Sequence, residues 1–201
     1  AGARSTADIE HNGLTLNGVG NGTKIENIYV LESADDAIEF FGGTVNVTNL
    51  LAVNPDDDMF DFTQGYCGTL KNCYGVWESD YTSTEADPRG IEADGNMDGL
   101  YPDHLRQSDF KVENMTIVNN AANTADNVDR MQDVIKIRRG AKATITNALV
   151  KGTGGAIDLV DMKDSKGAGN IESSINITST LSLTGSVSYT HLRAHETLSD
   201  L

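Results

Sequence analysis

The chain of 201 residues is long enough for one large domain or two small ones, and it carries 30 acidic residues against 15 Lys and Arg. A net charge of −15 disfavours nucleic acid and anionic lipid as partners, because their phosphates would be repelled. The same charge suits cations or neutral sugars. No apolar run reaches the ~18 residues of a membrane-spanning helix, so no transmembrane segment is predicted.

Five segments in chain order share an apolar–x–Asn–apolar core, and each predicts a short strand. They are IENIYV (25–30), VTNLLAV (47–53), LKNCYGV (70–76), VENMTIV (112–118) and ITNALV (145–150). Their asparagines are 22, 23, 42 and 33 residues apart, which indicates a unit of about 22 residues with insertions in the longer intervals. Asparagines stacked at one position would form a hydrogen-bonded ladder.

A second strand follows each asparagine. These strands are DAIEF (36–40), DMFDF (58–62), GIEAD (90–94), DVIKI (133–137) and GAIDL (155–159). One unit cannot bury its apolar side alone, whereas stacked units share a continuous core. The sequence therefore predicts an all-β, right-handed parallel β-helix with at least five rungs, and a β-sandwich is the alternative. Two insertions, roughly 77–89 and 119–131, would leave the stack at the same position.

Alternation within the second strands separates inward from outward side chains. The predicted inward column is Ile38, Phe60, Ile91, Ile135 and Ile157. The predicted outward column is Glu39, Asp61, Glu92, Lys136 and Asp158. Stacked strands lie about 4.8 Å apart, so carboxylates on adjacent rungs would repel by roughly 3 kcal/mol at an effective dielectric near 20.

A proton, a basic neighbour or a metal ion relieves such repulsion. We therefore expect Glu39, Asp61 and Glu92 to form a cation-binding ladder, for which Ca²⁺ is the best candidate because it prefers many oxygen ligands. The alternative is that these acids extend separately into water.

The segment DGNMDG (94–99) resembles the opening of a calcium loop, with Asp94, Asn96 and Asp98 as ligands. Leu105 stands where an EF-hand would place its bidentate Glu, and no flanking helices are predicted. A non-helical calcium loop remains the hypothesis, and an ordinary Asx/Gly turn is the alternative.

Aromatic and basic residues flank the acidic columns. Trp77, Tyr81 and Tyr101 are candidate sugar-binding residues, although single aromatic residues often serve only in packing. Lys136 and Arg138, with Asp61, are candidate catalytic residues, since a base beside a metal could remove a proton α to a uronate carboxylate. Acids two units apart could instead serve an inverting hydrolase. The alternative role of Lys136 is charge balance.

Several features bear on the ends of the chain and its redox state. The start, AGARST, lacks an initiator Met, so we expect a fragment that is incomplete at both ends. Residues 187–201 resemble the translation of a sequencing-library adapter, and we expect them to be a non-native tail behind a domain of residues 1–186. His191 and His195 at helical i, i+4 spacing would otherwise indicate a metal pair. Cys67 and Cys73 could form a disulfide or remain thiols.

Longer stretches resemble a known group of proteins. These stretches are HNGLTLNGVGNGTKIENIYV, DDAIEFFGGTVNVTNLLAV, DDDMFDFTQGYCGTLKN and GIEADGNMDG. They are similar to largely uncharacterised secreted or surface proteins of marine and gut bacteria, often labelled lipoproteins, that form right-handed parallel β-helices. The resemblance implies a secreted or bacterial cell-surface location and transfers no activity or catalytic residue.

Three functions are compatible with these observations. The first is an extracellular or cell-surface β-helix protein that binds calcium and contacts a polysaccharide or cell-surface glycan without cleaving it. The second is a calcium-assisted polysaccharide lyase or glycoside hydrolase, and the third is a structural adhesin or stalk. The sequence leaves the oligomeric state open.

Overall fold

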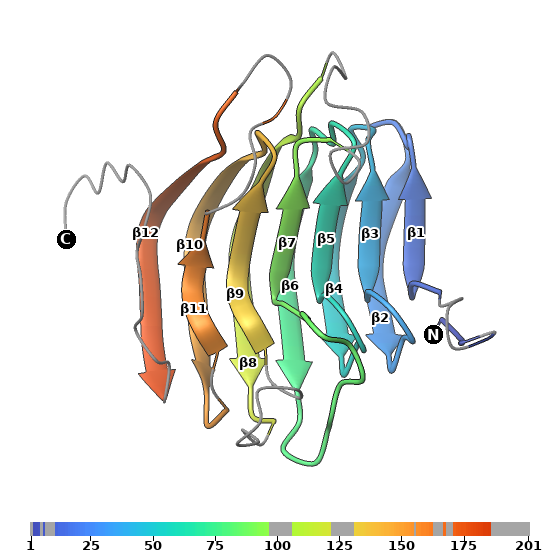
Figure 1. The fold of residues 1–201 in the computed structure, drawn as a ribbon. Coiled ribbons are helices and arrows are strands. Elements are labelled where there is room, and N and C mark those ends of the chain that lie inside the picture. The colour runs from blue at the N-terminus through green and yellow to red at the C-terminus, as the bar shows by residue number, and fades with distance from the viewer. Residues whose placement is uncertain are drawn as a thin grey trace.

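The computed structural model describes residues 2–4, 6, 11–96, 106–121, 131–154, 156–162, 167 and 171–185. These residues form two parallel six-stranded sheets and no helix (Figure 1). The odd-strand sheet contains, in spatial order, β1 (Leu14–Asn17), β3 (Ile38–Phe41), β5 (Phe60–Thr63), β7 (Ile91–Asp94), β9 (Met131–Arg138) and β11 (Ala156–Asp161). The even-strand sheet contains β2 (Lys24–Leu31), β4 (Asn46–Val53), β6 (Thr69–Trp77), β8 (Asp109–Asn119), β10 (Lys142–Gly152) and β12 (Ser174–Gly185).

The chain alternates between the two sheets, so each odd strand and the even strand after it make one rung. Six such rungs stack in chain order, with every strand parallel to its neighbour in the rung above (Figure 1). The predicted right-handed parallel β-helix is confirmed. Within the described ranges, no helix is long and apolar enough to cross a membrane.

The predicted asparagine ladder runs along the even-strand sheet. Asn27, Asn49, Asn72, Asn114 and Asn147 all have left-handed backbone conformations, with φ between 53° and 59°. From Asn49 onward, each side-chain amide donates to the Oδ1 of the asparagine one rung before it, at 2.8–3.0 Å. Asparagine tolerates this left-handed conformation better than most residues. It bends the strand, so that strand residues before and after the asparagine can face the same core.

The core between the sheets contains the predicted inward columns. Ile38, Phe60, Ile91 and Ile135 are completely buried. In the next column, the rings of Phe40 and Phe62 stack with centroids 5.2 Å apart. Alternation of apolar and polar residues was therefore sufficient to assign the inward faces of β3, β5 and β7.

The predicted register is wrong at the last odd strand. Ile135 pairs with Val160 rather than Ile157, and Asp158 pairs with Asp133 rather than Lys136. The successive residues Val134 and Ile135 are both buried, so β9 departs from strict alternation of inward and outward side chains. An alternation pattern extended through β9 therefore assigns the wrong partners to the residues of β11. In the observed register Asp161 stands beside Lys136 and forms an ion pair with it.

The connections follow the predicted insertions. Residues 78–90 link β6 to β7, and the link between β8 and β9 includes residues 122–130, which lie outside the described ranges. Cys67 and Cys73 are free thiols, so the disulfide alternative is not observed. The proposed tail, 187–201, also lies outside the described residues, and the domain boundary at residue 186 stays a prediction.

Candidate functional site

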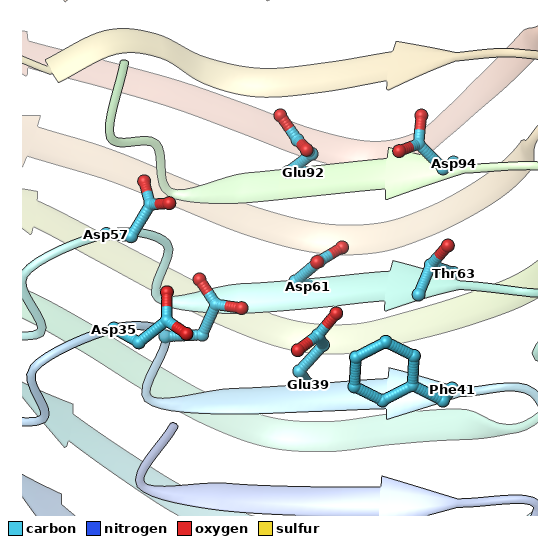
Figure 2. A pocket seen from close by; sticks show the side chains of 9 residues that line it. Asp35, Glu39, Phe41, Asp57, Asp61, Thr63, Glu92 and Asp94 are labelled. Carbon is cyan, nitrogen blue, oxygen red and sulfur yellow. The ribbon is translucent and has the colours of Figure 1, made fainter. Parts of the chain in front are cut away.

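Acidic side chains line the outer face of the odd-strand sheet. Glu39 pairs with Asp61, Asp61 with Glu92, and Glu92 with Lys136, as the repeat predicted. Figure 2 shows the three acids on adjacent strands. They border a pocket of about 260 Å³. Its lining is Asp35, Asp36, Glu39, Phe41, Asp57, Asp61, Thr63, Glu92 and Asp94.

The turns that precede β3 and β5 add acids that sequence analysis did not include among the site residues. Asp35 and Asp57 enter the pocket from these turns (Figure 2). The turns stack closely, because the Asp58 backbone N–H donates to the Asp36 carboxylate at 2.9 Å and the Ala37 N–H donates to the Asp58 carbonyl at 2.9 Å. The available signal was the doubled acid at the same place in DDAIEF and DDMFDF.

This stack of turns begins with a neutral residue. The Asp36 backbone N–H donates to the Asn12 side-chain oxygen at 3.2 Å, just as Asp58 uses Asp36 one rung later. Asn12 therefore occupies the equivalent position in the first rung, and its amide also donates to Glu39. Among the described residues, the buried acids of this stack begin in the second rung, with Asp36.

In and beside this pocket, buried carboxylate oxygens without a hydrogen-bond partner are found on the β5 rung: Oδ1 of Asp57, Asp58 and Asp61. Asp58 is 2% exposed and Asp61 is 9% exposed. A buried carboxylate without a partner is unfavourable by several kcal/mol, unless a proton or a cation compensates it. These oxygens mark the part of the site that a proton or a cation would stabilise.

The pKa values of the pocket carboxylates indicate the same excess of negative charge. Burial, followed by the charge of Asp58, raises the pKa of Asp36 well above its usual range, and burial with neighbouring Asp36 does the same for Asp61. The pKa of Asp57 is raised to about 8 by burial and then by nearby carboxylates. Because the charges named here are negative, the carboxylates lower one another's acidity.

At the β7 end of the acidic column, arginines compensate the negative charge of the carboxylates. Glu92 is bound through one oxygen by Arg89 and through the other by Arg138. Arg138 also donates to Asp94 at 2.7 Å through Nε, and Arg139 contacts Asp94 at 2.8 Å. Guanidinium groups thus occupy the oxygens of two predicted calcium ligands, although burial still raises the pKa of Glu92.

The predicted catalytic bases are engaged in ion pairs. Lys136 pairs with Asp161 and lies 3.8 Å from Asp133, which Arg89 also contacts at 3.3 Å. Arg138 holds Glu92 and Asp94, as described above. These contacts match the charge-balance alternative for Lys136, while a catalytic role for Lys136, Arg138 or Asp61 stays a prediction.

The calcium-like loop is only partly described. Asn96 is buried, and its backbone carbonyl accepts a hydrogen bond from the Thr63 hydroxyl at 3.2 Å. Asp98 and Tyr101 lie outside the described residues. A calcium loop at 94–99 therefore stays a prediction, and the arginines on Asp94 weigh against it.

The two described aromatic candidates support a turn. Trp77 is completely buried and its indole N–H donates to the Pro55 carbonyl at 3.0 Å, so it presents no exposed ring. The Tyr81 hydroxyl contacts the Pro55 carbonyl at 3.0 Å and Asp56 at 3.2 Å. Both residues hold the turn that leads into Asp57.

Exposed tyrosines occur elsewhere, on the even-strand sheet. Tyr29 and Tyr74 are 59% and 41% exposed, and both pair with Leu51, which lies between them.

Comparison with known families agrees with this architecture. The family model described as a pectate-lyase-like β-helix domain matches residues 1–198. The chain belongs to this family. No curated protein and no solved structure matches the chain. Membership in the pectate-lyase-like β-helix family indicates a polysaccharide-related protein, and it leaves the ion, the ligand and the chemistry to be argued from the site.

Proposed function

We propose that this protein is a secreted or cell-surface β-helix protein that binds calcium in its acidic pocket and contacts polysaccharide without cleaving it. The family supports the link to polysaccharide. The observation that carries the calcium proposal is the set of unpartnered, buried oxygens on Asp57, Asp58 and Asp61. The best candidate ligands are Asp36, Glu39 and Asp61, rather than the arginine-bound Glu92 and Asp94.

The residues present fit a hard divalent cation. One oxygen each from Asp36, Glu39 and Asp61 lies within 4.8 Å of the other two, and the three carboxylates come from adjacent rungs. Calcium accepts six to eight oxygens at irregular geometry, including water, which a carboxylate cluster open to solvent on one side can provide. Bound calcium would supply the positive charge that the cluster lacks.

A non-cleaving role is supported by the ion pairs around the pocket. Arg89, Lys136 and Arg138 each hold carboxylates, so removing a proton from a ligand would require breaking these pairs. Calcium-assisted cleavage is the second candidate. It is favoured by the position of Arg138, which pairs with Asp94 across adjacent strands at the edge of the pocket.

Thermal unfolding tests the calcium proposal. After removal of divalent ions with a chelator, millimolar Ca²⁺ should raise the Tm by several degrees, since a ligand that binds only the folded state stabilises it. Asp61→Asn should abolish this rise. The matched control, Glu26→Gln, alters an acid on the even-strand sheet that pairs with Lys24, and it should leave the rise intact. An unchanged Tm in the unaltered protein would refute calcium binding.

A polysaccharide panel tests the rest of the proposal. We expect retention of the protein on at least one acidic or neutral polysaccharide, with no new reducing ends and no ultraviolet absorbance from unsaturated products. Absence of retention across the panel would contradict polysaccharide contact. Products that disappear in an Arg138→Gln variant would establish the cleavage alternative.

A further inference from the structure

The even-strand sheet carries an exposed apolar patch on its outer face. Of the five large apolar side chains that are exposed among the described residues, four lie there, and we term them the tyrosine patch: Tyr29, Leu31, Leu51 and Tyr74. Leu51 pairs with Tyr29 on one side and with Tyr74 on the other, so these three form one column across β2, β4 and β6. The three strands belong to the sheet that does not carry the acidic pocket (Figure 1).

The patch differs in charge from the rest of the chain, whose net charge is −15. Followed through the described strands β2 to β10, the two columns that contain the patch have no acidic residue. The columns are Tyr29, Leu51, Tyr74, Thr116 and Leu149, and Leu31, Val53, Val76, Val118 and Lys151. Such a surface favours an uncharged ligand, because a polyanion would be repelled by the remainder of the protein.

The asparagine ladder borders the tyrosine column. Each residue of the column follows a ladder asparagine by two positions, and these asparagines, Asn27, Asn49 and Asn72, are exposed. A side-chain amide has two N–H donors and two acceptor sites, and the ladder uses one N–H and one acceptor site of Asn49 and of Asn72. The ladder therefore offers further hydrogen-bonding capacity on each rung, directly beside the apolar column.

The spacing of the column matches a chain of sugars. Tyr29 and Tyr74 are two rungs apart, which places them about 9.6 Å from each other at the usual separation of stacked strands. A sugar ring in an extended polysaccharide advances the chain by nearly the length of one rung. The C–H groups on the face of a sugar ring pack against an apolar or aromatic side chain, while its hydroxyl groups need hydrogen-bond partners. The column and the ladder provide both kinds of contact.

The size of the patch disfavours a protein partner. Three rungs and two columns cover roughly 200 Å² at the spacing of stacked strands, whereas a stable protein interface takes about 800 Å² from each partner. A second copy of this chain would also bring a second net charge of −15 close to the first. A narrow ligand that follows the column meets neither difficulty.

We propose that the tyrosine patch binds a neutral, extended polysaccharide that runs along the axis of the stack. Successive sugar rings lie on Tyr29, Leu51 and Tyr74, and the ladder asparagines bond to the sugar hydroxyls. This inference rests on the proposed function, and it adds the surface that contacts the polysaccharide and the class of polysaccharide.

Calorimetric titration of the full chain with neutral β-1,4-linked oligosaccharides of glucose, mannose and xylose tests this inference. In at least one series the trisaccharide should bind roughly tenfold more tightly than the disaccharide, because only the trisaccharide reaches both aromatic rings. Tyr74→Ala should remove this gain, and Tyr29→Ala should weaken trisaccharide binding by a similar factor. Tyr29→Phe keeps the ring and should bind within about twofold of the unaltered protein.

The control variant is Glu26→Gln, which lies on the same sheet beyond the asparagine ladder and should leave sugar binding unchanged. Thermal unfolding with and without Ca²⁺ shows whether each variant folds and keeps its response to calcium. Since Tyr29 and Tyr74 are exposed, we expect both alanine variants to keep the Tm and the calcium response of the unaltered protein. The dependence on oligosaccharide length in the unaltered protein tests the inference without any substitution.

The outcomes separate this inference from the proposed function. Trisaccharide binding that survives both alanine substitutions, or retention only on a polyuronate, would overturn the inference and leave polysaccharide contact intact. Retention on no polysaccharide would overturn both. A dimer that dissociates in Tyr29→Ala, measured by analytical ultracentrifugation, would assign the patch to a contact between copies and would also overturn the inference.

Discussion

The two ends of the acidic column differ in how the repulsion between their stacked carboxylates is compensated. Glu92 and Asp94, on β7, are neutralised by arginines that belong to the fold. Asp58 and Asp61, in the β5 rung, keep buried oxygens without partners. Because stacking brings like charges onto adjacent strands in both places, the comparison shows that repetition alone does not make a site. The candidate site lies where the described residues leave buried carboxylate oxygens without a hydrogen-bond partner.

Replacing an arginine should have the largest effect on stability. In Arg89→Met, Glu92 and Asp133 lose a buried partner, and breaking a buried ion pair in this way destabilises by about 3–5 kcal/mol. Urea unfolding measures the change. The control Lys71→Met, which breaks an exposed pair with Glu113, should lower stability by less than about 1 kcal/mol. Equal, small losses of stability in Arg89→Met and Lys71→Met would contradict the proposed difference between the two ends of the acidic column.

Replacing an acid in the β5 rung should have the opposite effect and increase stability. Without calcium, Asp58→Asn should raise the free energy of unfolding by about 1–2 kcal/mol at pH 8, since it removes a buried carboxylate whose Oδ1 has no hydrogen-bond partner and whose charge Arg89 offsets only in part. Chemical unfolding in chelator measures this change. A loss of stability comparable to that of Arg89→Met would mean that Asp58 has a stabilising partner.

Stability without calcium should fall as pH rises from about 4 to 8. The folded-state pKa of Asp57 is about 8, above the unfolded value near 4, so the folded protein binds more protons in this window. The stabilisation is fully present below the unfolded pKa and is lost as pH approaches the folded one. Calcium should flatten the profile. Unfolding midpoints between pH 4 and 9 would show this, and a rise over the window would contradict it.

Removing the hydroxyl of Tyr81 should have the smallest effect. Tyr81→Phe loses hydrogen bonds to Pro55 and Asp56, which amounts to about 1 kcal/mol of stability. Because these bonds support the turn before Asp57, at the edge of the acidic pocket, calcium affinity should weaken by no more than a few-fold. Tyr74→Phe, on the even-strand sheet, is the control and should change neither quantity. A loss of calcium affinity as large as that expected for Asp61→Asn would contradict this prediction.

The repeat predicted the fold because each rung repeats the same side-chain roles. Asparagines at left-handed positions and the alternation in β3, β5 and β7 depend on local chemistry that the sequence displays directly. Asp158 was misplaced, because β9 buries Val134 and Ile135 in succession and the pattern does not reveal such a departure.

The site was less predictable than the fold. Alternation correctly placed Glu39, Asp61 and Glu92 in one column, but it could not show which carboxylate meets an arginine. Arg89 reaches Glu92 from the loop before β7, and Arg138 reaches it from the next rung; both contacts depend on three-dimensional packing. Trp77 was a candidate sugar-binding residue because its local sequence does not show that the ring is buried and that its N–H donates to the Pro55 carbonyl.

The most direct measurement is a crystal structure of the calcium-loaded protein, with the ions located by anomalous scattering. Calcium binding in the acidic pocket predicts an ion on Asp36, Glu39 and Asp61, with arginine ion pairs that remain on Glu92 and Asp94. An ion on Glu92 and Asp94 with those arginines displaced, or a pocket without an ion at saturating calcium, would contradict it.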